Sequence, residues 1–237
     1  MSQLKPYRRA GTVIAAASVC WGLGIAMVGN VHAIHDPAVR LSTLERHRGL
    51  WILGQFLAAA GTAAAPLGFA RFAQQLGRYQ QHQSGPVKDS GAGPGPAQKL
   101  ATASAAAFLA GSPMFVVTLA GRAADIERFA YRRGPAWPFL SYAGLQTFGI
   151  GALGGALLLS PLKGPTATGA AASAPLFAAI LLRYKDLPPF VFYAVELAAG
   201  IRLMRYAAGP ETASPRIAAP ATAPEPHQPP VNPRLRS

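Results

Sequence analysis

The segment Leu100–Gly121 reads LATASAAAFLAGSPMFVVTLAG and contains no Asp, Glu, Lys or Arg in its 22 residues. At about 1.5 Å of rise per residue, a helix of this length is about 33 Å long, slightly more than the hydrocarbon core of a bilayer, which is about 30 Å thick. The segment therefore predicts a membrane-spanning α-helix.

Four more runs lack charged residues over comparable lengths: Ala10–Ile34, Gly49–Ala70, Gly134–Leu162 and Gly164–Leu182. One such run is also compatible with a buried helix of a soluble protein, but five in 237 residues indicate a polytopic membrane protein. A sixth span, Leu187–Tyr206, contains Glu196 and requires Arg202 and Arg205 to extend toward the headgroups.

The expected fold class is all-α, a polytopic membrane helix bundle of about six transmembrane helices, with five as the alternative. A single transmembrane domain occupies residues 1–208. Gln80–Gln98 has the Gly, Pro, Gln and Ser content of a flexible linker, and the proline-rich residues 209–237 predict a disordered tail. The expected spans cover residues 10–34, 49–70, 100–121, 137–160, 164–182 and 187–206.

Composition supports a lipid environment. Charged residues make up 13% of the chain, against about 25% in typical soluble domains. The net charge of +13 comes from cations at the ends of the apolar runs, which favours headgroup contact and argues against nucleic-acid binding. The single cysteine, Cys20, excludes an internal disulfide and a multi-cysteine metal site.

Basic residues in the connections do not decide the orientation, because ten would lie inside and nine outside if the N-terminus is cytoplasmic. The basic N-terminal residues and the basic linker favour both termini in the cytoplasm. The richness in Ala, Gly, Pro and Arg is typical of a high-GC bacterial genome, so we expect a bacterial plasma membrane. The first run is longer than a signal-peptide core of about 7–15 residues and is expected to remain, with cleavage after Ala33 as the alternative.

Four polar residues are the intramembrane candidates: Glu196, Gln55, Gln146 and Asn30. Glu196 leads, because a charge near the bilayer centre costs at least about 2.5 kcal/mol and such residues usually face a partner or a wet cavity. It is interpreted as a proton- or cation-handling carboxylate. The alternative is a neutral or paired Glu that locks helix packing, with Arg202, Gln55, Gln146 or Tyr142 as its partner.

Three expected spans contain an interior proline, namely Pro66, Pro113 and Pro175. A proline removes one backbone hydrogen bond and predicts a kinked or broken helix. Pro66 and Pro175 lie in similar strings three spans apart, as an inverted repeat around a transporter-like site would place them. Chance similarity in an Ala- and Pro-rich chain is the alternative.

Three of the five histidines, His32, His35 and His47, fall with Asp36 in the first connection. Such a group could bind Zn or another divalent metal at the membrane surface, although no HExxH motif is present. Solvated loop histidines are the alternative. Ser42–Glu45 reads as a capping box that opens the second helix.

Gly151 and Gly155 form a GxxxG motif in the fourth expected span. Small residues at this spacing let helices approach closely in lipid. The motif is compatible with ordinary packing inside the chain or with a homo-oligomer.

The region Leu41–Gln55, LSTLERHRGLWILGQ, leads from a polar turn into a Trp-led apolar helix. It resembles uncharacterised small multi-spanning membrane proteins of bacteria, over about the first 80 residues, and this group brings no established activity. No phosphate-cradling loop, nucleophile elbow or carboxylate pair is found, so we expect no enzyme and no cofactor. The leading expectation is a small transporter-like or accessory membrane subunit. A membrane-embedded enzyme or metal-binding protein, or a structural partner of a membrane complex, are the alternatives.

Overall fold

The computed structural model describes residues 5–83 and 93–206, and every regular element in these ranges is helical. The expected all-α class is therefore confirmed, while the predicted tail at 209–237 lies outside the described residues. The elements are α1 (Arg8–Ala26), the 3-10 helix η1 (Gly29–Ala33), α2 (Pro37–Arg46), α3 (Arg48–Gln83), α4 (Pro96–Ala124), α5 (Ile126–Ala130), α6 (Trp137–Leu158), α7 (Pro165–Tyr184) and α8 (Phe190–Arg205).

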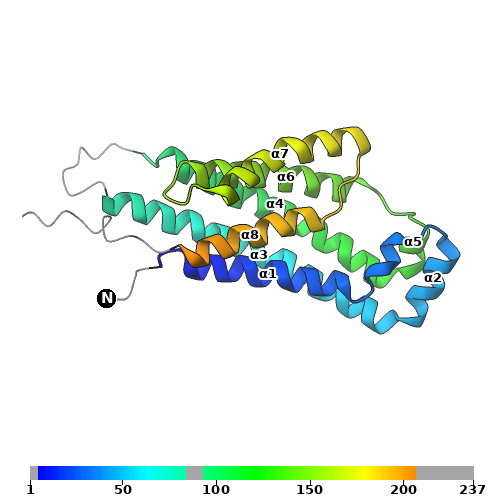
Figure 1. Ribbon diagram of the computed structural model, residues 1–237. Helices are drawn as coiled ribbons and strands as arrows, with labels where there is room; N and C mark the ends of the chain where they lie inside the picture. The colour runs from blue at the N-terminus through cyan, green and yellow to red at the C-terminus, as the bar shows by residue number, and fades with distance from the viewer. Residues whose placement is uncertain (1–4, 84–92, 207–237) are drawn as a thin grey trace, which may run out of the picture.

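The long helices α1, α3, α4, α6, α7 and α8 lie side by side in one bundle (Figure 1). α3 packs between α1 and α4, α4 packs against α6, and α7 and α8 lie on α6 and α1 respectively. Successive helices run in opposite directions, so α1 begins and α8 ends where α3 and α4 are connected. We call this the linker end of the bundle, and the opposite end carries η1, α2 and α5, which together form the cap.

Glycines allow the closest helix crossings. A Cβ atom at Gly24 of α1 would meet the carbonyl of Gly54 on α3, and a Cβ at Gly11 would meet the carbonyl of Gly200 on α8. Since hydrocarbon offers no hydrophobic drive between helices, close backbone contact provides much of the attraction that holds such a bundle together.

Four helices are long and apolar enough to cross a membrane, namely α1, α3, α4 and α7. α8 has 16 residues, and α6 includes the polar residues Tyr142, Gln146 and Thr147. Membrane-compatible helices are thus found for four of the expected spans, and the remaining two form helices of the same bundle.

Two predicted boundaries are wrong. The first span was expected to reach Ile34, but α1 ends at Ala26, because Gly29 and Asn30 disfavour helix and η1 follows. The linker expected at Gln80–Gln98 is shorter, since α3 continues to Gln83 and α4 begins at Pro96. Proline fits there because the first helical residue needs no N–H partner.

The cap has its own small apolar core, formed by Val28, Val31, Leu44, Trp51, Ile126 and Ala130. α2 begins eight residues before Glu45, with Asp36 as its N-cap, because the Asp36 carboxylate accepts from the N–H groups of Ala38 (2.8 Å) and Val39 (3.3 Å). The predicted capping box at Ser42–Glu45 is therefore wrong. Ser42 lies inside α2 and donates to the carbonyl of Val39 at 3.0 Å.

The GxxxG motif of α6 packs inside the chain. A Cβ at Gly151 would lie 3.0 Å from the Cβ of Ala174 on α7, and a Cβ at Gly155 would lie 3.0 Å from Leu100 on α4. The two glycines therefore seat α6 between two of its neighbours.

Candidate functional site

Glu196 lies at the centre of the bundle with 0% of its side chain exposed. It shares the inward face of α8 with Phe192, Tyr193, Ala199, Gly200 and Leu203. Neither of its carboxyl oxygens has a hydrogen-bond partner among residues 5–83 and 93–206. An ionisable group is thus held in a dry, packed interior without a counter-charge.

A chain of hydroxyl groups lies beside this carboxyl. Tyr142 of α6 donates to the hydroxyl of Tyr193 at 3.1 Å, and the Tyr193 hydroxyl lies 2.6 Å from Oγ1 of Thr62 on α3. Thr62 in turn donates to the carbonyl of Ala58 at 2.9 Å. Because each hydroxyl has one hydrogen, this order makes Tyr193 the donor to Thr62 and leaves no tyrosine hydrogen for Glu196.

The same two tyrosines are the near polar neighbours of Glu196, close enough for electrostatic interaction with it. Gln146, one turn along α6 from Tyr142, interacts with the Tyr142 hydroxyl through its side chain. We call Thr62, Tyr142, Gln146, Tyr193 and Glu196 the Glu196 cluster. It joins three helices, α3, α6 and α8, at one level of the bundle.

Aromatic rings cover the cluster on two sides. Trp21 of α1 stacks on Tyr193 with ring centroids 4.1 Å apart, and Phe115 of α4 stacks on Tyr142 at 4.2 Å. Phe192 meets Tyr142 edge-on at 6.0 Å. These rings exclude solvent, so a carboxyl and a hydrogen-bonded chain of hydroxyl groups lie together in an apolar enclosure.

Pro66 is connected to this cluster through the backbone. Its missing N–H leaves the carbonyl of Thr62 without its helical partner. The Ser112 hydroxyl of α4 lies 3.0 Å from that carbonyl and 2.8 Å from the carbonyl of Phe108, so its single hydrogen is shared between the two. α3 consequently runs unbroken through Pro66, and α4 and α7 likewise continue through Pro113 and Pro175. The three helices are therefore not broken at these prolines, because a single lost hydrogen bond does not end a packed helix, and the alternative of a kink stays a prediction.

Of the four polar candidates, the structure brings Glu196 and Gln146 together. Gln55 is also buried on α3, but it is not part of the Glu196 cluster, because it lies seven residues, or about two helical turns, before Thr62. Asn30 is exposed in η1, outside the spans, because α1 ends before it. Arg202, a predicted partner of Glu196, instead donates to the carbonyl of Lys163 at 3.4 Å.

The histidine group does not assemble as a metal site. Among the described residues, no three His, Cys, Asp or Glu side chains are placed to hold a metal ion. Asp36 is occupied as the N-cap of α2, and His32 packs against Trp51 and Phe129 with ring centroids 6.0 and 5.8 Å away. All three side chains, those of His32, His35 and His47, are exposed to solvent.

Packing and charge change the titration of His32. Desolvation of its imidazole, together with the nearby guanidinium groups of Arg122, Arg40 and Arg132, lowers its pKa from 6.5 to about 4. Both influences disfavour a cationic imidazolium. His32 is therefore neutral in the folded cap at neutral pH.

Sequence reasoning missed Thr62 and Tyr193, which supply the hydroxyls closest to the centre of the cluster. One signal was available, since Tyr193 precedes Glu196 by three residues and must share its face of a helix. No local signal points to Thr62, which meets Tyr193 across a separation of 131 residues.

Comparison of the chain with protein-family models, curated proteins and solved structures finds no match. The fold and the site must therefore be interpreted from their own geometry. That geometry defines a helical bundle with membrane-compatible helices and, at its centre, a buried carboxyl to which none of the described residues is hydrogen-bonded.

Proposed function

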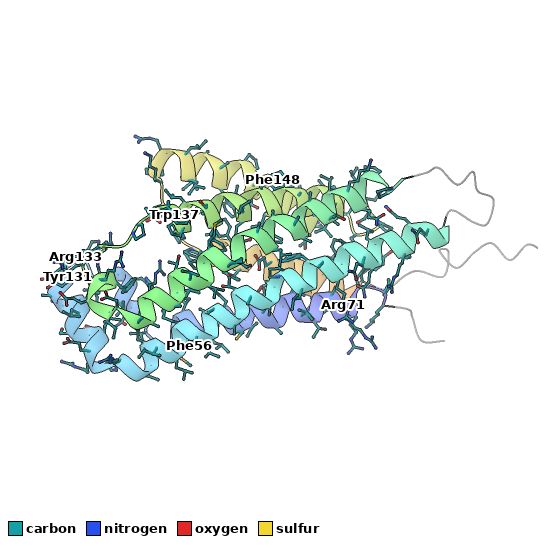
Figure 2. The ribbon with its side chains drawn as sticks, turned by 180° about the vertical axis from the view of Figure 1, so that it is seen from behind. Phe56, Arg71, Tyr131, Arg133, Trp137 and Phe148 are labelled. Atoms are coloured by element: carbon teal, nitrogen blue, oxygen red, sulfur yellow. The ribbon has the colours of Figure 1, made fainter. Side chains whose placement is uncertain are left out.

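We propose that the chain is an integral membrane protein in which α6 and α8 cross the bilayer together with α1, α3, α4 and α7. Large apolar side chains on the outer surface support this, among them Phe56 at 62%, Val117 at 68% and Leu182 at 81% exposure. Figure 2 shows Phe56 and Phe148 on the outside of α3 and α6. In water such a surface would promote aggregation, whereas in lipid it costs nothing.

The short helix α8 is compatible with a span. Its 16 residues give about 24 Å of helix, and Arg202 and Arg205 in its last turn can reach the headgroups along their aliphatic stems. We place the protein in a bacterial plasma membrane, with the linker end cytoplasmic, on the composition and the basic N-terminal segment.

Within this bundle we propose a small transporter-like activity in which Glu196 carries a proton. The observation that supports it is the fully buried carboxyl, which has no hydrogen-bond partner in the described part of the chain and lies near the hydroxyls of Tyr193 and Tyr142. A structural glutamate would be expected to have a fixed hydrogen-bond partner, since an unpaired buried polar group costs stability. Rotation of a tyrosine hydroxyl toward Glu196 would let a proton leave or arrive.

The test is proton uptake by proteoliposomes that contain a pH-sensitive dye and are driven by a potassium gradient with valinomycin. We expect wild-type protein to acidify the lumen and Glu196→Gln to be inactive, because the amide cannot release a proton. Glu45→Gln, an exposed carboxylate of α2, is the matched control and should retain the flux.

Equal flux through wild-type and Glu196→Gln protein would remove Glu196 from the mechanism, and no flux through either would favour an accessory subunit. Infrared difference spectra between acidic and alkaline buffer provide a second readout. A protonated-carboxyl band that is absent from Glu196→Gln protein and changes with pH would show that this group exchanges its proton.

A further inference from the structure

A basic hollow lies between α1 and α3 on the half of the bundle near the linker end. It is lined by Arg8, Arg9, Thr12 and Val13 of α1 and by Arg71 of α3. All three arginines are exposed, and Figure 2 shows Arg71 on the half of the bundle away from Tyr131 and Arg133 of the opposite end. Two helices thus present three guanidinium groups to one small volume.

These cations are not neutralised by the described part of the chain. No ion pair or hydrogen bond to a carboxylate involves Arg8, Arg9 or Arg71, and the described ranges place no Asp or Glu at the linker end. The five acidic residues of the opposite end show the contrast: Asp36, Glu45, Asp125, Glu127 and Asp186. Within residues 5–83 and 93–206 the positive charge of the hollow is therefore uncompensated, which favours an anionic ligand.

The position of the hollow indicates where such a ligand comes from. Arg8 and Arg9 directly precede the charge-free run that begins at Ala10, and Arg71 directly follows the run that ends at Ala70. The three arginines therefore stand at the boundary between apolar and polar surface on both helices. Val13 extends the lining one turn into the apolar region, where an acyl chain would lie.

We propose that this hollow binds the phosphate of an anionic phospholipid, with the three arginines around the headgroup and Val13 beside the first acyl carbons. Guanidinium groups suit this ligand, because their planar donor forks match phosphate oxygens. Thr12 lines the hollow but donates no hydrogen bond to the phosphate, since its hydroxyl donates to the carbonyl of Arg8 at 2.9 Å. The inference rests on the membrane insertion proposed above, but it does not require Glu196 to carry a proton.

The experiment titrates dioleoyl phosphatidylglycerol into the full-length protein in neutral detergent and follows the thermal unfolding midpoint. Wild-type protein should be stabilised at low lipid concentration, and the triple variant Arg8→Gln, Arg9→Gln, Arg71→Gln should need roughly a hundredfold more lipid. Each basic residue near an anionic surface contributes about 1 kcal/mol, which is about fivefold in affinity. Arg71→Gln alone should therefore cost about fivefold.

The matched control is Arg46→Gln, Arg128→Gln, Arg183→Gln, which removes three exposed arginines from the cap side of the bundle. It should bind the lipid like wild-type protein. Equal loss in both triple variants would mean nonspecific charge attraction and would overturn the site. Circular dichroism of each variant checks that its helices are intact, and Arg71→Gln keeps the test valid if the triple variant unfolds.

Two further arms distinguish the source of the anion. Phosphatidylcholine, whose headgroup is neutral overall, should not stabilise the protein at the same concentrations. Inorganic phosphate should also have little effect, because it lacks acyl chains. If phosphate stabilised the protein as much as the lipid does, the ligand of the hollow would be a free anion and the lipid proposal would be overturned. Glu196→Gln should bind the lipid normally, so failure of the proton-carrier proposal would leave this result unchanged.

Discussion

Two buried ionisable residues of this molecule, Arg40 in the cap and Glu196 in the bundle, have opposite surroundings. Arg40 is 3% exposed and donates through Nε to the carbonyl of Ile34 at 3.0 Å and through Nη1 to that of Ala130 at 2.6 Å. Its Nη2 also donates to Ile34. Glu196 is equally inaccessible, yet neither of its oxygens has a partner among the described residues.

Arg40 is thus a charge held by hydrogen bonds, whereas Glu196 is a buried carboxyl that no hydrogen bond from the described residues holds. Arg40 is fixed by three donors that tie α2 to η1 and α5, so its loss should open the cap. Glu196 holds nothing in place by hydrogen bonds, so its replacement by an isosteric amide should alter chemistry more than stability. Burial alone would not have distinguished the two residues.

The largest expected effect on stability is that of Arg40→Gln. The change leaves the carbonyls of Ile34 and Ala130 without their charged donor, and bonds of this kind contribute about 1.5–3 kcal/mol each. We expect the cap to lose about 3 kcal/mol or more, measured as faster hydrogen exchange in α2 and α5. Arg46→Gln, on the exposed side of α2, should exchange like wild-type protein.

The next largest effect is expected for Tyr193→Phe, which interrupts the hydroxyl chain beside Glu196. It removes the contacts to Thr62 and Tyr142 and should lower the stability of the bundle by about 2 kcal/mol. Thermal unfolding in detergent measures this change, with the exposed Tyr131 replaced by Phe as the control. An equal loss of stability in both variants would contradict the conclusion that the hydrogen-bonded hydroxyl groups beside Glu196 stabilise the bundle.

A smaller effect is expected for Ser112→Ala, which leaves the carbonyl of Thr62 unpaired opposite Pro66. The cost should be about 1 kcal/mol. Pro66→Ala restores a backbone N–H to that carbonyl, so Ser112→Ala should cost less in the Pro66→Ala background. A double-mutant cycle by thermal unfolding measures this coupling. Strictly additive effects would refute the idea that Ser112 replaces the backbone N–H that Pro66 lacks.

The effect that is smallest at neutral pH, and that grows only as the pH falls, is the pH dependence of the cap through His32. Unfolded chain binds a proton at this residue with a pKa of 6.5 and folded chain with a pKa of about 4, so the unfolded state holds more protons between these values. Cap stability should therefore fall as pH decreases from about 6.5 to about 4. His32→Asn should flatten this part of the profile, whereas His35→Asn, at an exposed position, should preserve it.

Much of this protein could be predicted from local sequence. The five charge-free runs located α1, α3, α4, α6 and α7, the expected span at 187–206 located α8, and the prolines at 96, 165 and 138 follow the usual rule for first turns. Glu196 was recognisable because an acidic residue inside an apolar helix is costly wherever the helix packs. These features depend on composition and on the helical period, which are properties of each segment by itself.

Other features were decided by tertiary structure. Tyr193 and Thr62 meet only because α3 and α8 have particular rotations and depths in the bundle, and His32 turned toward Trp51 instead of toward the other histidines. Counting basic residues suggested that the two ends are nearly equal in charge. In the structure, however, the described acidic residues outside the bundle centre all lie at the cap side. Sequence specifies which residues a helix carries, whereas packing against neighbouring helices determines which of them come within hydrogen-bond distance.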